Sequence, residues 1–359
     1  MTKPRLHIFL GAGGVGKTTL SAAFAVSLAN SGRHVGLLSI DPARRLQQAL
    51  GVQHLSDEGV LIPTHSGKGE LRACVLQAEQ SLTRWVEEKG MDAESIEKLF
   101  ANPYFHALSE KMASATDVLA AVRIAEWAEQ HSHMTDLVID TAPGIHAVDF
   151  IVKPEKMMLF LDSKLAEWLK LLVVDSRKKK QNIFARVLKT GAQKILEGLS
   201  FVGGKHFLIN FGEFLILLDE ILLTAVNRLK VTHQWFFHSS TRFVLVTSVR
   251  SSTALVAKEF ARILKSKNIV PSLCVVNRAL NSSVAEPQKS ALNAEKIFLT
   301  YLANYQESQN STCQILKACA QKVVTLPVFS HLDSQTQLRM QDLCLLGDHL
   351  RHNAGDILP

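Results

Sequence analysis

The residues whose types and spacing carry the clearest chemistry lie near the start of the chain. Residues 11–18 read GAGGVGKT, which fits the phosphate-loop pattern GxxxxGK[ST]. In this pattern, glycines let successive N–H groups turn inward around phosphates, Lys17 places a positive charge on the outer phosphates, and the Thr18 hydroxyl ligates Mg²⁺. The sequence therefore predicts a nucleotide site made of consecutive residues: Gly11, Ala12, Gly13, Gly14, Val15, Gly16, Lys17, Thr18 and Thr19.

Two acidic residues at the ends of other apolar runs could complete this site. Asp140 ends the run in DLVIDTAPG and is predicted to hold the metal through water, the alternative being a turn residue at a strand end. The loop after it is predicted to sense the terminal phosphate, because glycine permits backbone changes; its residues are Thr141, Ala142, Pro143 and Gly144. Asp41, in LLSIDPARRL, is a candidate to orient the attacking water, although capping the next helix explains it equally well. Lys17 and Asp41 are thus the catalytic candidates.

The elements that must position these residues form a regular alternation. Short apolar runs rich in β-branched residues alternate with longer helical stretches, and lie at 6–10, 35–40, 136–140, 157–161, 243–247, 273–277 and 323–328. This alternation predicts an α/β fold with a doubly wound, mostly parallel sheet, and the phosphate loop makes it a P-loop NTPase. The runs are apolar throughout, as expected when helices cover both faces. Ligands then bind at the carboxyl ends of the strands.

Two regions depart from this alternation. Residues 79–131 and 162–238 contain helical segments without a convincing strand, and both are predicted to be helical insertions above the sheet of a single domain, residues 1–359. Between Phe207 and Leu229 the apolar residues cover more than one helical stripe. Something must cover this surface, and the domain core, a dimer contact or a client protein would each do so.

Composition narrows the class of protein. The chain is 47% hydrophobic and 20% charged, and no apolar stretch approaches the ~20 residues of a membrane helix. Because the start leads directly into the phosphate loop, we expect no signal peptide and a cytoplasmic protein, with peripheral membrane association left open. The five cysteines form no CxxC pair and suggest neither a disulfide framework nor a zinc site. The net charge of +7 is scattered apart from residues 177–180, so nucleic-acid binding is not favoured.

Several motifs together point to a family. The segments GAGGVGKTTL, SIDPARRLQQALG, ANPYF, LVIDTAPGIHAVDF and VVNR, in this order, resemble the ArsA-like ATPases. That family includes arsenite-pump ATPases and ATPases that deliver tail-anchored membrane proteins, and the resemblance is nearest to a bacterial single-domain branch. It implies ATP hydrolysis with ATP and Mg²⁺ as cofactors, and a dimer with facing ATP sites, either a homodimer or a heterodimer with a paralogous ATPase. It places Asp41 and Asp140 on the acids of the two switches and Asn277 on the residue that reads the adenine edge.

The chain also departs from the family pattern. Ala12 stands where the family signature has a lysine that reaches the partner's phosphate, which implies slow hydrolysis or a different dimer geometry. The second switch reads DTAPGIH, which moves its glycine by one place and keeps His146. No cysteine lies between Cys74 and Cys274, where the family's metalloid ligands flank the second switch, and this argues against arsenite.

Three functions remain open at this point. The favoured one is an ATPase switch that acts on a hydrophobic or membrane-protein client, because residues 157–229 carry a broad apolar surface. The second is a positioning ATPase that binds DNA or a membrane surface, which the net positive charge would suit. The third is a weakly catalytic subunit of a heteromeric ATPase, which Ala12 would explain.

Overall fold

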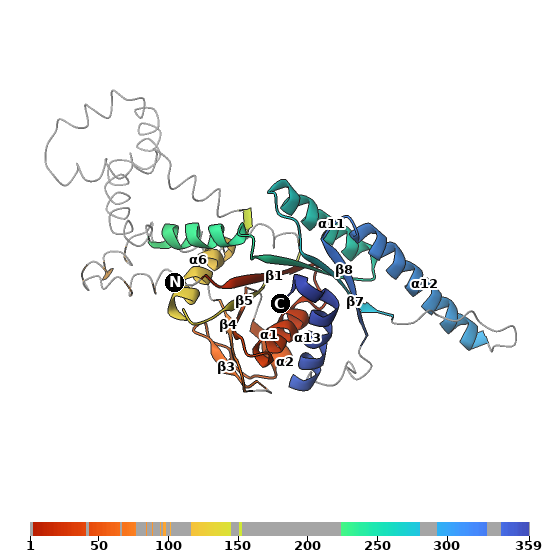
Figure 1. Cartoon of the computed structure of the whole chain (residues 1–359), viewed down its shortest axis with the longest axis horizontal. Helices are drawn as coiled ribbons and strands as arrows, with labels where there is room; N and C mark the ends of the chain where they lie inside the picture. Colours follow the sequence, from red (N-terminus) through yellow and green to blue (C-terminus); the bar gives the residue numbers. More distant parts are fainter. Residues whose placement is uncertain are drawn as a thin grey trace, which may run out of the picture. The chain divides into compact units, whose positions relative to one another are not determined.

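A computed structural model describes most of the chain outside the second predicted insertion. The described residues are 3–40, 43–64, 67–76, 116–144, 151–152, 224–280, 293–328 and 339–358, together with 84, 88, 94, 96, 97 and 101. The chain divides into two compact units, of which the first comprises residues 1–76, 127–151 and 234–359 and the second comprises residues 77–126 and 152–233. The first unit contains the sheet and the phosphate loop (Figure 1).

A single eight-stranded sheet forms the centre of the first unit, in the order β3-β4-β2-β5-β1-β6-β7-β8. The strands are β1 (Arg5–Gly11), β2 (His34–Ser39), β3 (Val60–Ile62), β4 (Glu70–Val75), β5 (Asp136–Asp140), β6 (Arg242–Ser248), β7 (Leu273–Ala279) and β8 (Lys322–Pro327). Only β3 is antiparallel to its neighbour. The predicted α/β fold with a mostly parallel sheet is therefore confirmed, and β1, which leads into the phosphate loop, lies between β5 and β6.

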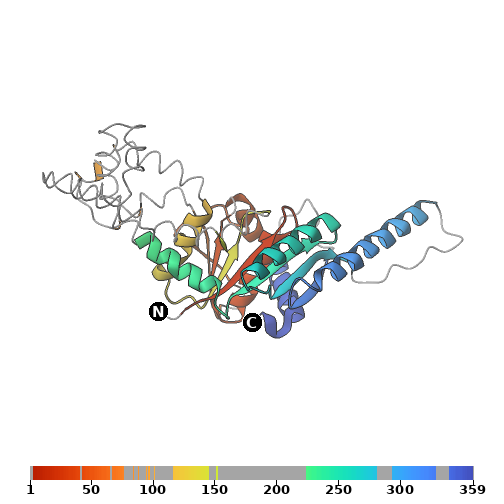
Figure 2. The ribbon, with the colours of Figure 1, turned by 90° about the horizontal axis from the view of Figure 1, so that it is seen from above.

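Helices cover both faces of this sheet (Figure 2). On one face, a continuous core joins alternate strand residues to α1 (Lys17–Asn30), α2 (Ala43–Leu50) and α13 (Met340–Ala354). On the other face lie α11 (Ser251–Ser266) and α12 (Asn293–Leu316), and a short 3-10 helix, η3 (Gly355–Ile357), follows α13. The central strands are buried on both sides, which explains why their sequences are apolar throughout rather than alternating.

One close approach fixes the packing of β2. Trp127, near the end of α6 (Thr116–Gln130), is fully buried, and its Nε1 donates a hydrogen bond to the Glu58 carbonyl at 3.2 Å. A Cβ atom at Gly36 would come within 2.5 Å of the Trp127 ring. Because Val35 and Leu37 belong to the core on the α1 face, Trp127 covers the opposite face of β2. Only glycine leaves room for the indole at this point.

Buried polar side chains join the amino ends of the central strands. Asp136 is fully buried; its Oδ1 accepts a hydrogen bond from Nε2 of His7 at 3.0 Å, and its Oδ2 accepts one from Nε of Arg33 at 2.6 Å. Burial lowers the pKa of His7. Burial alone would raise the pKa of Asp136, but the hydrogen bonds from His7 and Arg33 bring it below its usual value. The pair therefore favours a neutral imidazole beside an ionised carboxylate.

The structure adds two strands to those that the sequence predicts. β3 has three residues, and β4 alternates buried with half-buried positions in its first half, so neither forms a continuous apolar run. The run at 157–161 lies outside the described residues. Of the two predicted insertions, the structure describes α6 and a helix at 224–236, which are joined in the second unit by a 2.7 Å hydrogen bond from the Thr232 hydroxyl to the Ala121 carbonyl. The single-domain boundaries with two insertions remain a prediction.

Candidate functional site

The phosphate loop connects β1 directly to α1. Gly14 and Gly16 have φ angles of 76° and 90°, in the left-handed region where a side chain is strained, and Gly16 is the N-cap of α1. The first helical bond runs from the Leu20 N–H to the Gly16 carbonyl at 2.9 Å. The remaining N–H groups of the first turn stay available, and together with the helix dipole they favour an anion at this end. The loop predicted from GAGGVGKT thus has the backbone that phosphate binding requires.

Asn277 of β7 lies against this loop. Its Nδ2 donates a hydrogen bond to the Val15 carbonyl at 2.9 Å, and its Oδ1 accepts one from the N–H of Arg278 at 2.9 Å. A Cβ atom at Gly16 would come within 2.4 Å of Nδ2 of Asn277. The structure therefore brings Asn277 next to the nucleotide loop and shows it bracing the loop. Its role in reading the adenine edge remains a prediction.

A buried ion pair links the loop to the end of β5. Nζ of Lys17 lies 3.0 Å from Oδ1 of Asp140 and also donates a hydrogen bond to the Thr141 carbonyl. The other carboxylate oxygen of Asp140 accepts a hydrogen bond from the Ser39 hydroxyl at 3.2 Å. Lys17 is 5% exposed and Asp140 is fully buried, so an unpaired charge at either position would be costly.

The predicted switch residues run alongside the phosphate loop. The Thr141 hydroxyl donates a hydrogen bond to the Phe9 carbonyl of β1 at 2.8 Å. The N–H of Gly144 donates to the Gly11 carbonyl at 3.2 Å, and Gly144 has a φ angle of 83°. Pro143 would be in ordinary contact with a side chain at Gly13. With Ala142 among them, these residues form a short segment that is hydrogen-bonded to the end of β1 beside the loop, so a change in the loop can affect the segment.

The oxygen donors of this site suit a hard cation. Thr18 stands in the first turn of α1, immediately after Lys17, and Asp140 faces the same loop through Lys17. Hydroxyl and carboxylate oxygens are the ligands that Mg²⁺ prefers. Sequence reasoning did not identify Ser39, whose place follows from its pairing with Asp140 across β2 and β5. Asp41 and His146 lie outside the described residues.

The parallel sheet, the glycine loop at the start of α1 and the lysine–aspartate pair define a P-loop NTPase. A family model described as anion-transporting ATPase matches residues 5–200, which is more than half of the chain. The chain therefore belongs to the anion-transporting ATPase family. The predicted ArsA-like family is confirmed, and so is ATP hydrolysis as the activity of the class.

Three relatives illustrate the range of this family. The chain is 24% identical over 304 residues to ATPase GET3B of Arabidopsis thaliana, which covers 79% of the chain and 66% of that relative. It is 30% identical over 158 residues to the putative arsenical pump-driving ATPase 2 of Aquifex aeolicus (strain VF5), covering 44% of the chain and 52% of the relative. It is 25% identical over 169 residues to the arsenical pump-driving ATPase of Escherichia coli, covering 45% of the chain and 27% of the relative.

The chain matches only part of each of these relatives. Each match spans less than two thirds of the relative's own length. The narrower assignment to a bacterial single-domain branch stays a prediction. Among the described residues, no helix combines the length and the apolar character needed to cross a membrane.

Proposed function

We propose that this chain is a nucleotide-dependent switch that binds Mg–ATP at the phosphate loop, hydrolyses it, and acts on a hydrophobic or membrane-protein client. The observation that carries the proposal is the contact of Lys17 with both Asp140 and the Thr141 carbonyl. The negatively charged terminal phosphate of ATP competes with the Asp140 carboxylate for the ammonium group of Lys17. Binding of ATP would therefore draw the lysine away from the end of β5.

This competition supplies a mechanism for a switch. Loss of the Lys17 bond to Thr141 leaves the segment 141–144 held mainly by the bonds of Thr141 to β1 and of Gly144 to Gly11. A ligand shifts a conformational equilibrium only by contacts that differ between the two states, and the Lys17 bonds are such contacts. Gly144, already at a positive φ, can change its backbone at low cost.

The residues around the phosphates have distinct parts in the reaction. Lys17 and the N–H groups at the start of α1 stabilise the charge that develops on the transferred phosphoryl group. Thr18 and Asp140 would hold Mg²⁺, which neutralises phosphate charge when it is bound. Asp41 remains the candidate to orient the attacking water.

Ala12 bears on the rate of hydrolysis and on the dimer. Its side chain is half-buried and packs against the core on the α1 face, and a methyl group carries no charge to offer a neighbouring phosphate. We therefore expect slow turnover in a homodimer, or a partner chain that supplies the missing charge in a heterodimer with a paralogous ATPase.

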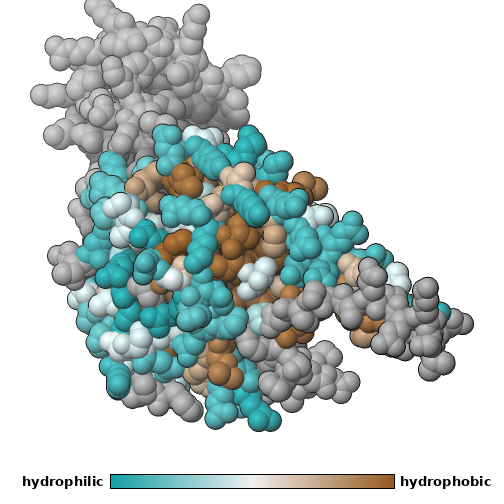
Figure 3. All heavy atoms as spheres, turned by 45° about the vertical axis from the view of Figure 1, so that its right-hand side comes forward, coloured by the Kyte–Doolittle hydropathy of each residue, from teal (hydrophilic) through white to brown (hydrophobic). Residues whose placement is uncertain are grey.

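The described residues carry an apolar surface of their own. Ile297, Phe298 and Tyr301, on the first turns of α12, are 72%, 59% and 61% exposed. Apolar residues also gather among hydrophilic ones on the face shown in Figure 3. Exposed apolar groups of this kind suit a hydrophobic partner, either a client or a second subunit. Most of the apolar surface predicted at 157–229 lies outside the described residues. We place the protein in the cytoplasm, with peripheral contact to the membrane where a membrane-protein client is delivered.

An arsenite cargo is less well supported, although two of the relatives are named for arsenical pumps. Cys74, Cys274 and Cys319 are buried, and burial raises the pKa of the Cys274 and Cys319 thiols. Burial also raises the pKa of the Cys313 and Cys344 thiols. Capture of a soft metalloid ion requires accessible thiolates, which all these shifts disfavour.

A capture experiment tests the client proposal. The full chain would be mixed with a peptide carrying an apolar transmembrane helix and with a scrambled polar peptide, in the presence of ADP or a non-hydrolysable ATP analogue. We expect capture of the apolar peptide that differs between the two nucleotides, and that loses this difference in Lys17→Ala. Equal capture in both nucleotides would refute the client role, and binding to DNA at low salt would favour the positioning ATPase instead.

A further inference from the structure

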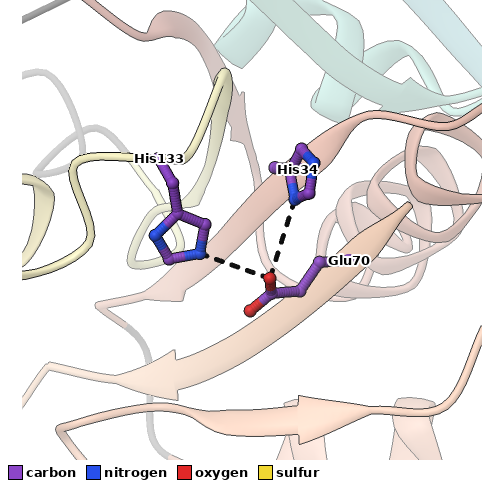
Figure 4. A group of neighbouring side chains, drawn as sticks. All are labelled: His34, Glu70 and His133. Atoms are coloured by element: carbon purple, nitrogen blue, oxygen red, sulfur yellow. Dashed lines mark hydrogen bonds and ion pairs between the residues drawn. The ribbon is translucent and has the colours of Figure 1, made fainter.

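Three polar side chains converge at the amino-terminal end of the parallel strands, opposite the end that carries the phosphate loop. His34 is the first residue of β2, Glu70 is the first residue of β4, and His133 lies in the turn before β5 (Figure 4). Because β2, β4 and β5 are parallel neighbours, their amino-terminal ends lie together at one end of the strands, whereas Asp140 and Lys17 lie at the carboxyl-terminal end. This cluster is therefore separate from the nucleotide site.

Two of the distances within the cluster are close to those between ligands of one metal ion. Oε2 of Glu70 lies 3.6 Å from Nδ1 of His34 and 3.2 Å from Nε2 of His133. One ligand atom from each residue can be chosen so that all three lie within 4.8 Å of one another. Two ligands of a tetrahedral zinc ion with bonds near 2.05 Å are separated by about 3.3 Å, so only small side-chain movements are needed.

The surroundings leave the three ligand atoms facing one another. Arg72 donates from Nε to Oε1 of Glu70 at 2.7 Å, which orients the carboxylate and leaves Oε2 facing the two imidazoles. The side chains of His34 and His133 are 47% and 51% exposed, so an ion and a water ligand can reach them.

A third nearby histidine does not join the cluster. The ring of His131 stacks on Trp127 at a centroid distance of 4.0 Å, and its Nδ1 lies 3.0 Å from the Trp127 carbonyl. Its ring centroid is 6.4 Å from that of His133, compared with 5.9 Å between His34 and His133. His131 is therefore committed to α6, and the candidate ligands remain two imidazoles and one carboxylate.

We propose that His34, Glu70 and His133 bind one divalent transition-metal ion of the zinc class, with water in the remaining position. Two imidazole nitrogens and one carboxylate oxygen suit such an ion, whereas Mg²⁺ and Ca²⁺ prefer oxygen alone. The ion would link three chain segments at the amino-terminal ends of β2, β4 and β5. Because it binds the folded chain, it raises the thermal stability of the protein by mass action.

Metal titration of the chelator-treated full chain tests this site. Zn²⁺ is titrated by calorimetry and Co²⁺ by visible absorption, without nucleotide and with excess Mg²⁺, so that the phosphate loop is not the metal site observed. The variants are His34→Gln, His133→Gln and Glu70→Gln. His54→Gln is the matched control, because His54 is an exposed histidine of the same unit outside the cluster. Circular dichroism verifies that each variant is folded.

The proposal predicts one equivalent of bound Co²⁺ with nitrogen and oxygen ligands, and a higher melting temperature with Zn²⁺. Each cluster variant weakens binding by at least about tenfold, which is the lower end of what loss of an outer-shell partner alone costs. His54→Gln keeps the affinity and the rise in melting temperature. Unchanged affinity in His34→Gln and His133→Gln, an equal loss in His54→Gln, or a thiolate-to-cobalt absorption band would each overturn the proposal.

Discussion

Replacing Gly16 by alanine tests how the phosphate loop is braced. Gly16 has a φ angle of 90°, and a Cβ atom there would come within 2.4 Å of Nδ2 of Asn277. Alanine at this position must therefore adopt a left-handed backbone and also push the Asn277 amide away. That amide now holds the Val15 carbonyl at 2.9 Å, so the substitution breaks this hydrogen bond.

The two costs can be separated in magnitude. A left-handed conformation costs an alanine about 1–2 kcal/mol. Loss of the Asn277 hydrogen bond to Val15 costs about 1 kcal/mol net. We therefore expect Gly16→Ala to lower the free energy of unfolding by about 2–3 kcal/mol, and Asn277→Ala by about 1 kcal/mol. Because both variants lose the same hydrogen bond, the double variant should cost no more than Gly16→Ala alone.

Urea unfolding of the two single variants and the double variant measures this coupling, which we expect to be about 1 kcal/mol. Gly14→Ala is the matched control, because Gly14 also has a positive φ of 76° but a Cβ there would meet nothing within 4 Å. Its cost should add to that of Asn277→Ala. Additive costs for Gly16→Ala and Asn277→Ala, within about 0.5 kcal/mol, would refute the bracing of the loop by Asn277.

Two further predictions concern the sheet. Burial lowers the pKa of His7, and the hydrogen bonds from His7 and Arg33 outweigh burial and lower the pKa of Asp136. Protonation of either group therefore destabilises the folded state relative to the unfolded state. The free energy of unfolding should therefore fall as the pH drops below about 6.5, through His7, and further below about 4, through Asp136. Urea unfolding at several pH values, in the presence of a chelator, measures this dependence. His7→Gln should remove the decrease in the free energy of unfolding that begins near pH 6.5, and an unchanged pH dependence in this variant would contradict the role of His7. Gly36→Ala should lower the free energy of unfolding by about 1–3 kcal/mol, because its Cβ overlaps the Trp127 ring. Thermal unfolding followed by circular dichroism measures this, and an unchanged stability would contradict the close packing.

The nucleotide loop could be predicted from the sequence because its requirements are local. GAGGVGKT supplies glycines, lysine and threonine within eight consecutive residues, and the apolar run before it fixes the preceding strand. The proximity of Lys17 and Asp140, far apart in the chain, followed from a general rule, since parallel strands bring their carboxyl ends to one edge. Continuous apolar runs and one local motif therefore sufficed for six of the eight strands and for the first residues of the site.

Contacts that depend on register or on short elements could not be predicted. Ser39 reaches Asp140 only because these residues are paired across β2 and β5. β3 and the first half of β4 lack a continuous apolar run, so the strand that carries Glu70 gave no signal. Without that strand, nothing in the sequence brings Glu70 near His34 and His133, which belong to no common motif.

The rate of phosphate release from Mg–ATP tests the central claim most directly. The full chain would be compared under single-turnover conditions with Lys17→Ala, and with Lys258→Ala as a control that removes an exposed lysine from α11. We predict slow hydrolysis by the unmodified chain, an unchanged rate for Lys258→Ala, and a loss of about 100-fold or more for Lys17→Ala, the scale seen when one stabilising donor is removed. Equal rates in the unmodified chain and Lys17→Ala would contradict the assignment of this loop as the ATPase site.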